Sequence, residues 1–161
     1  MTIPYAESYN GRLRKLVGKM KLIAISARGV IRDEQGRFLF VRRKDNGLWV
    51  MPAGSIELGE SIVGCVKREV MEETGLAVLN PVLFAIYSDP RYSFTTAYGD
   101  PYQGFSMNFL VEQWEGELLT ETDETNDARF FAVDELPDDV PPGYREAIED
   151  VQAFDGTVIL K

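Results

Sequence analysis

Three glutamates share one edge of a predicted helix. The stretch 61–74 has helical spacing, and at about 100° per residue Glu72 lies about 60° to one side of Glu69 and Glu73 about 40° to the other. Like charges at this spacing destabilise an isolated helix by roughly 0.2–0.5 kcal/mol, so a purely structural helix gains nothing from them. A divalent cation reverses the sign of that interaction, and Mg²⁺ commonly bridges carboxylates to phosphates. The cluster is therefore a candidate site for a divalent cation that activates a diphosphate, and a solvated acidic helix face is the other interpretation.

The rare residue types exclude most other catalytic chemistry. The chain of 161 residues has no histidine and a single cysteine, Cys65. A histidine-based triad, an intrachain disulfide and a zinc site built from cysteine and histidine are therefore excluded. A metal must be held by carboxylate and carbonyl oxygens, which favours a hard ion. The proton of an attacking water must pass to a carboxylate or be lost through metal-lowered acidity.

The residues around the glutamates follow a longer pattern. Gly54 is followed after five residues by Glu60, and after seven more by the run Arg68-Glu-Val-Met-Glu-Glu-Thr-Gly-Leu76. Over these 23 residues the spacing resembles the signature of the Nudix hydrolase family at every fixed position, and the similarity extends over roughly residues 22–136. The resemblance implies an α/β/α sandwich with a mixed β-sheet. It also implies metal-dependent hydrolysis of a nucleoside diphosphate linked to another group.

The resemblance implies roles for single residues as well. Glu69, Glu72 and Glu73 are the implied metal ligands, together with the backbone carbonyl of Ala53. Arg68 is implied to orient the carboxylates rather than to touch the substrate. Family members commonly have glycine in place of Ala53, and this departure matters only if the backbone there needs a positive φ.

Two acidic residues are candidates for the general base. Glu69 lies in the motif helix, whereas Glu124 lies in a later acidic loop, where some relatives carry an additional glutamate. The offset from Phe130 favours Glu124 within that loop, and a solvated acidic loop is the other interpretation. Glu60 also has two interpretations, as an outer metal ligand or as a carboxylate that interacts favourably with the helix dipole.

Substrate contacts are expected from the early strands and from aromatic residues. The candidates for binding phosphates are Arg28, Arg42, Arg43 and Lys44. The candidates for stacking on a base are Tyr87, Tyr92, Phe94 and Tyr98. Nucleotide sugars, ADP-ribose and modified nucleotides stay open as substrates. The alternative function is a Nudix-like module that senses a nucleotide without hydrolysing it, and retention of every motif glutamate favours the enzyme.

The elements that position these residues indicate an α+β fold. The chain is 45% apolar and long enough for one core, and its strands outnumber its helices without alternating regularly with them. We expect residues 1–20 to form a helical extension ahead of a Nudix domain at 21–161. The expected strands are 21–31, 37–43, 77–87, 104–114 and 128–133, and the expected helices are 9–20, 61–74 and 144–154. The apolar arc of the second helix, expected to face the core, comprises Val63, Val66 and Val70.

The first helix has an apolar stripe of its own. Its members, at i, i+3, i+4 and i+7, are Leu13, Leu16, Val17 and Met20. An extension ahead of the first strand has a reason to exist if it covers apolar surface, so we expect the stripe to pack against the domain or a partner subunit. Arg12, Arg14 and Lys15 then point outward.

The charge of the chain limits its partners. The net charge is −9, with 11 basic and 4 acidic residues in 1–50 but 2 basic and 11 acidic residues in 121–150. Such an acidic chain is a poor candidate for general nucleic-acid binding, and its longest apolar run, 82–87, is too short to cross a bilayer. We expect a small-molecule nucleotide as the partner, no nucleic acid and no membrane, and we leave a homodimer open. The start of the chain lacks a signal-peptide pattern, which favours the cytoplasm.

Overall fold

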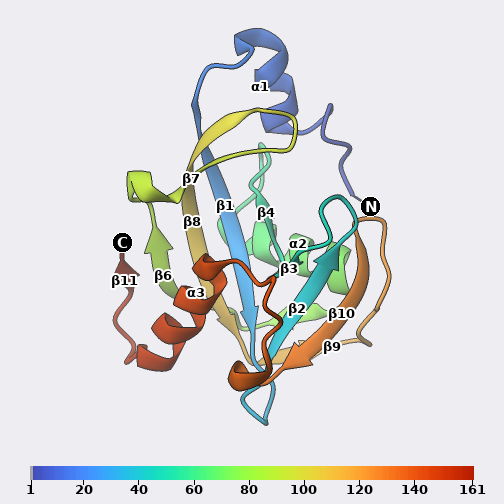
Figure 1. Ribbon diagram of the computed structural model, residues 1–161, viewed down its shortest axis with the longest axis vertical. Coiled ribbons are helices and arrows are strands. Elements are labelled where there is room, and N and C mark those ends of the chain that lie inside the picture. The colour runs from blue at the N-terminus through green and yellow to red at the C-terminus, as the bar shows by residue number, and fades with distance from the viewer. Residues whose placement is uncertain (1) are drawn as a thin grey trace.

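Strands dominate the fold, as their frequency in the sequence predicted. The computed structural model describes residues 2–161 and is shown in Figure 1. The elements in chain order are α1 (Tyr9–Val17), β1 (Leu22–Ile31), β2 (Phe38–Arg43), β3 (Trp49–Val50), β4 (Ala53–Ser55), α2 (Ile62–Thr74), β5 (Ala77–Leu79), β6 (Val82–Tyr87), η1 (Pro90–Tyr92), β7 (Ser93–Thr95), β8 (Pro101–Val111), β9 (Gln113–Glu115), β10 (Thr125–Phe131), η2 (Val133–Glu135), α3 (Pro142–Ala153) and β11 (Ile159–Leu160).

The largest sheet has six strands and is mixed. Its strands follow the order β11-β6-β8-β1-β4, and β7 pairs with β8 off this path. β1 and β8 pair in parallel over the whole length of β1, whereas β4 is antiparallel to β1 and β6 is antiparallel to β8. A three-stranded sheet has the order β10-β2-β3, and β5 pairs with β9. The turn after β1 therefore carries the chain from one sheet to the next, and the predicted mixed sheet is confirmed.

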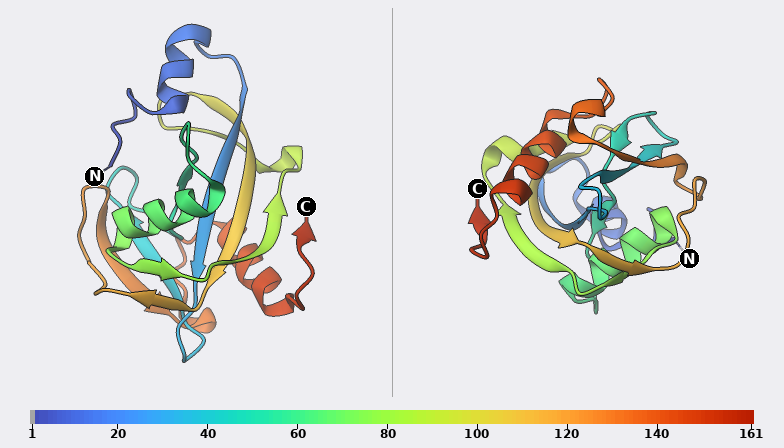
Figure 2. Two further views of the ribbon diagram at one scale, coloured as in Figure 1. Left: turned by 180° about the vertical axis from the view of Figure 1, so that it is seen from behind. Right: turned by 90° about the horizontal axis from the view of Figure 1, so that it is seen from below.

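The two larger sheets lie between helices α2 and α3, as Figure 2 shows. One core cluster joins α3 to the sheets and contains Phe40 and Ile148, and the other joins α2 to the sheets and contains Leu39 and Val70. β2 contributes to both clusters because successive residues of a strand face opposite sides. This arrangement is the predicted α/β/α sandwich. Within residues 2–161, none of the helices has the length and apolar character that a membrane span requires.

A glycine in β1 allows α2 to lie close to the sheet. A Cβ atom on Gly29 would be 2.7 Å from Cγ2 of Val70, so a larger residue there would push the helix away. Val66 and Val70 are fully buried, as predicted. Val63 is 40% exposed, and the prediction that it faces the core is wrong. Val63 lies about one turn before the crossing with Gly29, so that crossing does not cover it.

Backbone conformation explains the shifted element boundaries. α1 ends at Val17 instead of residue 20 because Gly18 adopts a φ of 60°. The predicted strand 77–87 is divided into β5 and β6, since Asn80 has a φ of 45° and a proline, Pro81, follows it. The predicted strand 104–114 likewise divides into β8 and β9. β11 contains two residues, too few to show the alternation from which a strand is predicted.

Helix α1 docks on the domain through a polar face, contrary to the prediction. The Arg14 side chain is 8% exposed and donates hydrogen bonds to the Tyr102 hydroxyl at 3.1 Å and to the Pro101 carbonyl at 2.8 Å. Leu16 is 83% exposed. Leu16 does not pack against the domain, which leaves a partner subunit as its predicted contact. The prediction that Arg14 points outward is wrong. The reason is the buried carboxylate of Asp100, which lies beside Arg14 and attracts the basic face of the helix.

The remaining side chains of α1 agree partly with the prediction. Leu13 and Val17 are half-buried, whereas Met20 is exposed. Arg12 and Lys15 are exposed, as predicted. Packing of the exposed part of the stripe against a partner subunit stays a prediction.

Candidate active site

Local sequence signals place α2 where the glutamates were predicted. The Ser61 hydroxyl accepts a hydrogen bond from the Gly64 amide at 3.0 Å and caps the start of the helix. Gly75 ends it in the left-handed conformation, with a φ of 76°. β4 passes beneath the helix, and a Cβ atom on Gly54 would lie 2.0 Å from Cδ of Glu69. Only glycine leaves room there for the Glu69 carboxylate.

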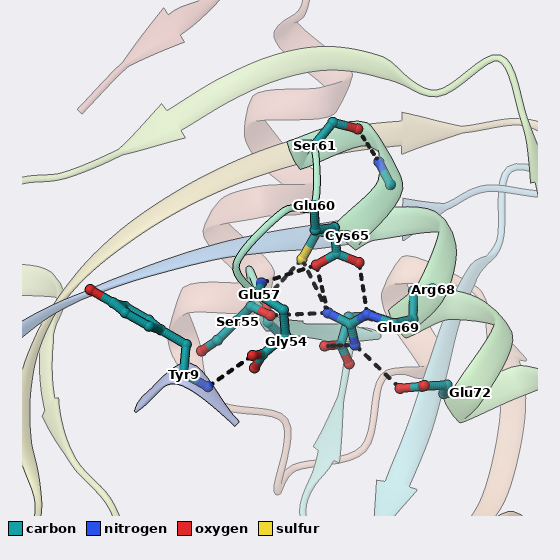
Figure 3. A network of polar contacts seen from close by, with 11 residues as sticks. Tyr9, Gly54, Ser55, Glu57, Glu60, Ser61, Cys65, Arg68, Glu69 and Glu72 are labelled. Carbon is teal, nitrogen blue, oxygen red and sulfur yellow. Dashed lines mark hydrogen bonds and ion pairs between the residues drawn. The ribbon is translucent and has the colours of Figure 1, made fainter. Parts of the chain in front are cut away.

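Arg68 lies at the centre of the acidic residues, as Figure 3 shows. Its Nη1 donates to Glu69 Oε1 at 2.6 Å and to Glu72 Oε2 at 3.3 Å. Its Nε and Nη2 donate to the two oxygens of Glu60 at 2.8 and 3.0 Å, and Nη2 also donates to the Ser55 carbonyl at 3.1 Å. One guanidinium thus holds three carboxylates in place, which agrees with an orienting role for Arg68.

Glu60 is engaged by this guanidinium. The Arg68 hydrogen bonds hold the pKa of Glu60 below its usual value. Glu60 Oε2 also accepts a hydrogen bond from the Glu57 amide at 3.1 Å. The geometry therefore points to Glu60 as the residue that positions Arg68, a role that neither sequence-based interpretation included.

Burial makes two of the carboxylates reluctant to ionise. Glu73 is 3% exposed, and its Oε2 has no hydrogen-bond partner among residues 2–161. Burial, followed by the charges of Glu69 and Glu124, raises the pKa of Glu73 well above its usual value. Burial also raises the pKa of Glu69 to about 7, against the lowering effect of Arg68. A buried carboxylate without a partner is costly unless a cation compensates it.

The loop ahead of β10 brings Glu124 to the same place. Glu124 lies far from α2 in sequence, yet its charge acts on Glu69 and Glu73, and it lines the same cleft as Glu69. The Lys44 amide donates to the Glu124 carbonyl at 2.9 Å, which ties this loop to the end of β2. The structure therefore unites both candidates for the general base.

The donors present suit a hard divalent cation. The candidate metal ligands are all oxygen atoms. One of them, Glu73 Oε2, has no hydrogen-bond partner among residues 2–161. Ala53, whose carbonyl is the implied backbone ligand, needs no left-handed conformation, because Asn80 is the only non-glycine residue with a positive φ in the part of the chain described. Within residues 2–161 no three acidic or thiol side chains already converge as a metal-binding group. The Arg68 guanidinium instead bridges Glu69 and Glu72, so these two must reorient slightly to share a cation.

A cleft of about 830 Å³ opens next to the carboxylates. This volume is in the range of pockets that hold nucleotide-sized ligands. The residues that line it are Thr2, Ile3, Tyr5, Ser8, Asn10, Arg43, Lys44, Asp45, Asn46, Ala53, Gly54, Ser55, Glu57, Arg68, Glu69, Glu72, Phe94, Thr95, Thr96, Ala97, Tyr98, Asp123 and Glu124. The cleft therefore joins three of the four predicted metal ligands, Ala53, Glu69 and Glu72, to segments far away in the sequence.

The predicted substrate contacts fall partly outside this cleft. Arg43 lines it, whereas Arg28, Arg42 and Tyr92 do not belong to its lining in the described residues. The Arg28 guanidinium lies 4.7 Å above the ring centroid of the partly buried Tyr144, and Arg42 Nε donates to the Gly47 carbonyl at 3.1 Å. Tyr92 stacks on Tyr87 with ring centroids 5.0 Å apart. Of these four residues, the geometry supports Arg43 best as a phosphate contact.

Sequence reasoning missed one whole wall of the cleft. Thr2, Ile3, Tyr5, Ser8 and Asn10 line it, yet residues 1–20 were expected only to cover apolar surface. The one sequence signal that points to them is a tyrosine, Tyr5, close to the predicted helix. That signal alone does not indicate where the segment lies.

Comparison with known proteins relates this geometry to a family. A family model described as NUDIX domain matches residues 22–151. The NAD-capped RNA hydrolase NudC of Vibrio cholerae is 37% identical over 101 residues, which make up 63% of this chain and 34% of the relative. The ADP-ribose pyrophosphatase of Methanocaldococcus jannaschii is 33% identical over 119 residues, which make up 71% of this chain and 64% of the relative.

A solved structure agrees with these matches. The MutT NUDIX hydrolase of Burkholderia pseudomallei superimposes with a TM-score of 0.67 at 26% identity, over 82% of this chain and 98% of that chain. This chain spans about a third of the length of the NudC relatives it matches. Because the family model covers well over half of the chain, the predicted membership is confirmed: the protein belongs to the Nudix hydrolase family.

Proposed function

We propose that the protein hydrolyses the diphosphate linkage of a nucleoside diphosphate derivative with Mg²⁺ or Mn²⁺. The observation that carries this proposal is the buried carboxylate of Glu73, whose Oε2 has no hydrogen-bond partner among residues 2–161. Its neighbours in α2, Glu69 and Glu72, line a cleft large enough for a nucleotide. A site that only sensed a nucleotide would not need to bury a carboxylate with one oxygen left without a partner. The same site supports catalysis because a bound cation offsets that cost.

The residues of the site are proposed to bind the ion or to position its ligands. Glu69, Glu72, Glu73 and the Ala53 carbonyl would hold the ion, which when bound polarises phosphate oxygens and lowers the pKa of water. Arg68 positions Glu69 and Glu72, since its Nη1 contacts both.

Two residues are placed to accept the proton of the attacking water. Glu124 lines the cleft from the loop before β10, and its charge acts on Glu69 and Glu73. Glu69 has a pKa raised to about 7 by burial, which suits a base near neutral pH but competes with a role as metal ligand. Replacing each with glutamine separates the two: loss of the base lowers kcat, whereas loss of a ligand also weakens activation by the ion.

The substrate is proposed to be a small nucleotide derivative. Arg43 and Lys44 line the cleft and are placed to contact the phosphates. ADP-ribose and nucleotide sugars fit this chemistry, and the relative named as an ADP-ribose pyrophosphatase supports the first of them. The relatives named as NAD-capped RNA hydrolases add NAD and NAD-capped RNA to the compounds to be tested. A cytoplasmic location and a homodimer stay predictions.

A substrate screen tests the proposal. ADP-ribose, UDP-glucose, NADH, an oxidised nucleoside triphosphate and NAD-capped RNA are each incubated with the protein and Mg²⁺ or Mn²⁺, and the products are separated chromatographically. We expect cleavage of at least one diphosphate linkage by the wild type and not by Glu72→Gln. Binding of several of these compounds without cleavage of any would favour the sensing module instead.

A further inference from the structure

The end of the cleft away from the carboxylates is aromatic. Tyr5 comes from the segment before α1, whereas Phe94 and Tyr98 come from β7 and the turn after it. These side chains are unusually open for their size, with 47% of Tyr5, 49% of Phe94 and 77% of Tyr98 exposed. Exposed aromatic rings gathered in a cleft indicate a surface that binds a flat, apolar group.

Two of the rings form a near-parallel pair. The rings of Tyr5 and Tyr98 have centroids 6.2 Å apart and an angle of 18° between their planes. Phe94 does not belong to this pair, because it stacks on Tyr102 at 5.4 Å. Of the three rings, that of Tyr98 is the most exposed, and Tyr5 lies beside it.

Long-range polar contacts fix the position of Tyr5. Its hydroxyl donates to Asp100 Oδ2 at 3.3 Å and lies 3.4 Å from the Tyr102 hydroxyl. Asp100 also accepts a hydrogen bond from Lys19 Nζ at 2.8 Å, and Arg14 Nε lies 3.8 Å from it. Residues at both ends of the N-terminal extension therefore hold one carboxylate at the start of β8.

The same segment is tied to the loop of the glutamates. The Tyr9 amide donates to Glu57 Oε2 at 2.8 Å, a contact that Figure 3 shows, and Asn10 Nδ2 donates to Ser55 Oγ at 3.0 Å. Figure 1 shows α1 and β7 at the same end of the molecule. Residues 2–10 thus connect the ionic end of the cleft to its aromatic end.

We propose that Tyr5 and Tyr98 bind the nucleobase of the substrate, so that the N-terminal segment is a specificity-determining wall of the active site. One cleft joins carboxylates and Arg43, which suit a diphosphate with its cation, to a pair of rings that suits a heterocycle. The ligand class rests on the proposed function. The competing explanation is that the tyrosine pair only holds the turn after β7 against the N-terminal segment.

Binding without hydrolysis separates these explanations. Isothermal titration calorimetry compares AMP, UMP and GMP with ribose 5-phosphate, which lacks the base. We expect at least one nucleotide to bind wild type about tenfold more tightly than ribose 5-phosphate, and Tyr98→Ala to remove that difference. Tyr98→Phe retains the ring and should retain the preference, and Tyr9→Ala, whose side chain lines a separate apolar groove, should change nothing.

The results of the titration distinguish recognition of a base from a structural role of the tyrosine pair. If all three nucleotides bind wild type no more tightly than ribose 5-phosphate, the aromatic pair does not recognise a base. Equal losses for the nucleotide and ribose 5-phosphate in Tyr98→Ala would show a structural role only. A base preference that depends on Tyr98 in a protein that cleaves nothing would support the aromatic pair and overturn the proposed hydrolase, whereas cleavage without such a preference would do the reverse.

Discussion

The two walls of the cleft are built in different ways. Residues 54–76 rely on local signals: a cap at Ser61, a left-handed glycine at Gly75 and a glycine under Glu69. Residues 2–20 rely on contacts between distant parts of the chain, such as those from Arg14 to Tyr102. The reacting groups can therefore be located from a short sequence motif. The residues proposed to select the substrate depend on tertiary contacts that a motif does not contain.

The largest effect is expected at Gly54. In Gly54→Ala the new methyl group overlaps the Glu69 carboxylate, which must move by about 1 Å or more and cost roughly a hundredfold in rate. The control is Gly143→Ala in α3, where an added Cβ has no atom within 4 Å among the described residues and activity should not change. Steady-state kinetics on an identified substrate measures both, and equal activity of the two variants would contradict the close approach of Glu69 to β4.

A smaller loss of rate is expected at Glu73. Glu73→Gln keeps the size of the side chain but removes a charge proposed to bind the ion, so the rate should fall at least tenfold, about 1.4 kcal/mol of barrier. Thermal unfolding without metal should show equal or higher stability, because the buried carboxylate has no partner for Oε2 in residues 2–161. Wild-type turnover by this variant would remove Glu73 from the set of ligands.

The raised pKa of Glu69 predicts how the stability of the metal-free protein depends on pH. The folded pKa is about 7, above the ordinary value of 4.5, so the folded state binds more protons and stability falls as pH rises through this range. Mg²⁺ must displace that proton, and its addition should raise the Tm more at pH 8 than at pH 6. Glu69→Gln should weaken both dependences and leave the part due to Glu73, whereas Glu34→Gln, an exposed control in the turn after β1, should leave them unchanged. A stabilisation by Mg²⁺ that was independent of pH would show that the ion does not displace a proton from Glu69.

The smallest effects concern helix α1. Arg14→Leu removes the donors to Tyr102 and Pro101, and its Tm should fall by roughly 3–6 °C. Leu16→Gln changes a side chain that is 83% exposed and should alter stability by no more than about 0.5 kcal/mol in the monomer. The reverse order of sensitivity would show that the apolar stripe, and not the polar face, attaches the helix. A loss of dimer in Leu16→Gln would instead support packing of the stripe against a partner subunit.

Several features that depend on local sequence were predicted correctly, whereas several that depend on contacts between distant parts of the chain were not. Helix α2 was predicted with its caps, and its glutamates lie together, because helical periodicity is a local property. The docking of α1 was predicted wrongly because periodicity identifies an apolar stripe but not the buried carboxylate at Asp100 that attracts the opposite face. The partners of Arg28 and Tyr92 depend on how the sheets pack, so their positions outside the cleft lining were not predictable from residue type.

Hydrolysis in water enriched in oxygen-18 shows whether the protein cleaves a diphosphate by metal-dependent attack of water. The substrate identified in the screen is incubated with the protein in the enriched water, with Mg²⁺ and in a parallel sample with excess EDTA, and the products are analysed by mass spectrometry. We expect one oxygen-18 atom in a phosphate-bearing product with Mg²⁺ and no hydrolysis with EDTA. Hydrolysis should recover when Mg²⁺ or Mn²⁺ is restored. Hydrolysis that persisted in excess EDTA, or products without solvent oxygen on phosphate, would contradict this mechanism.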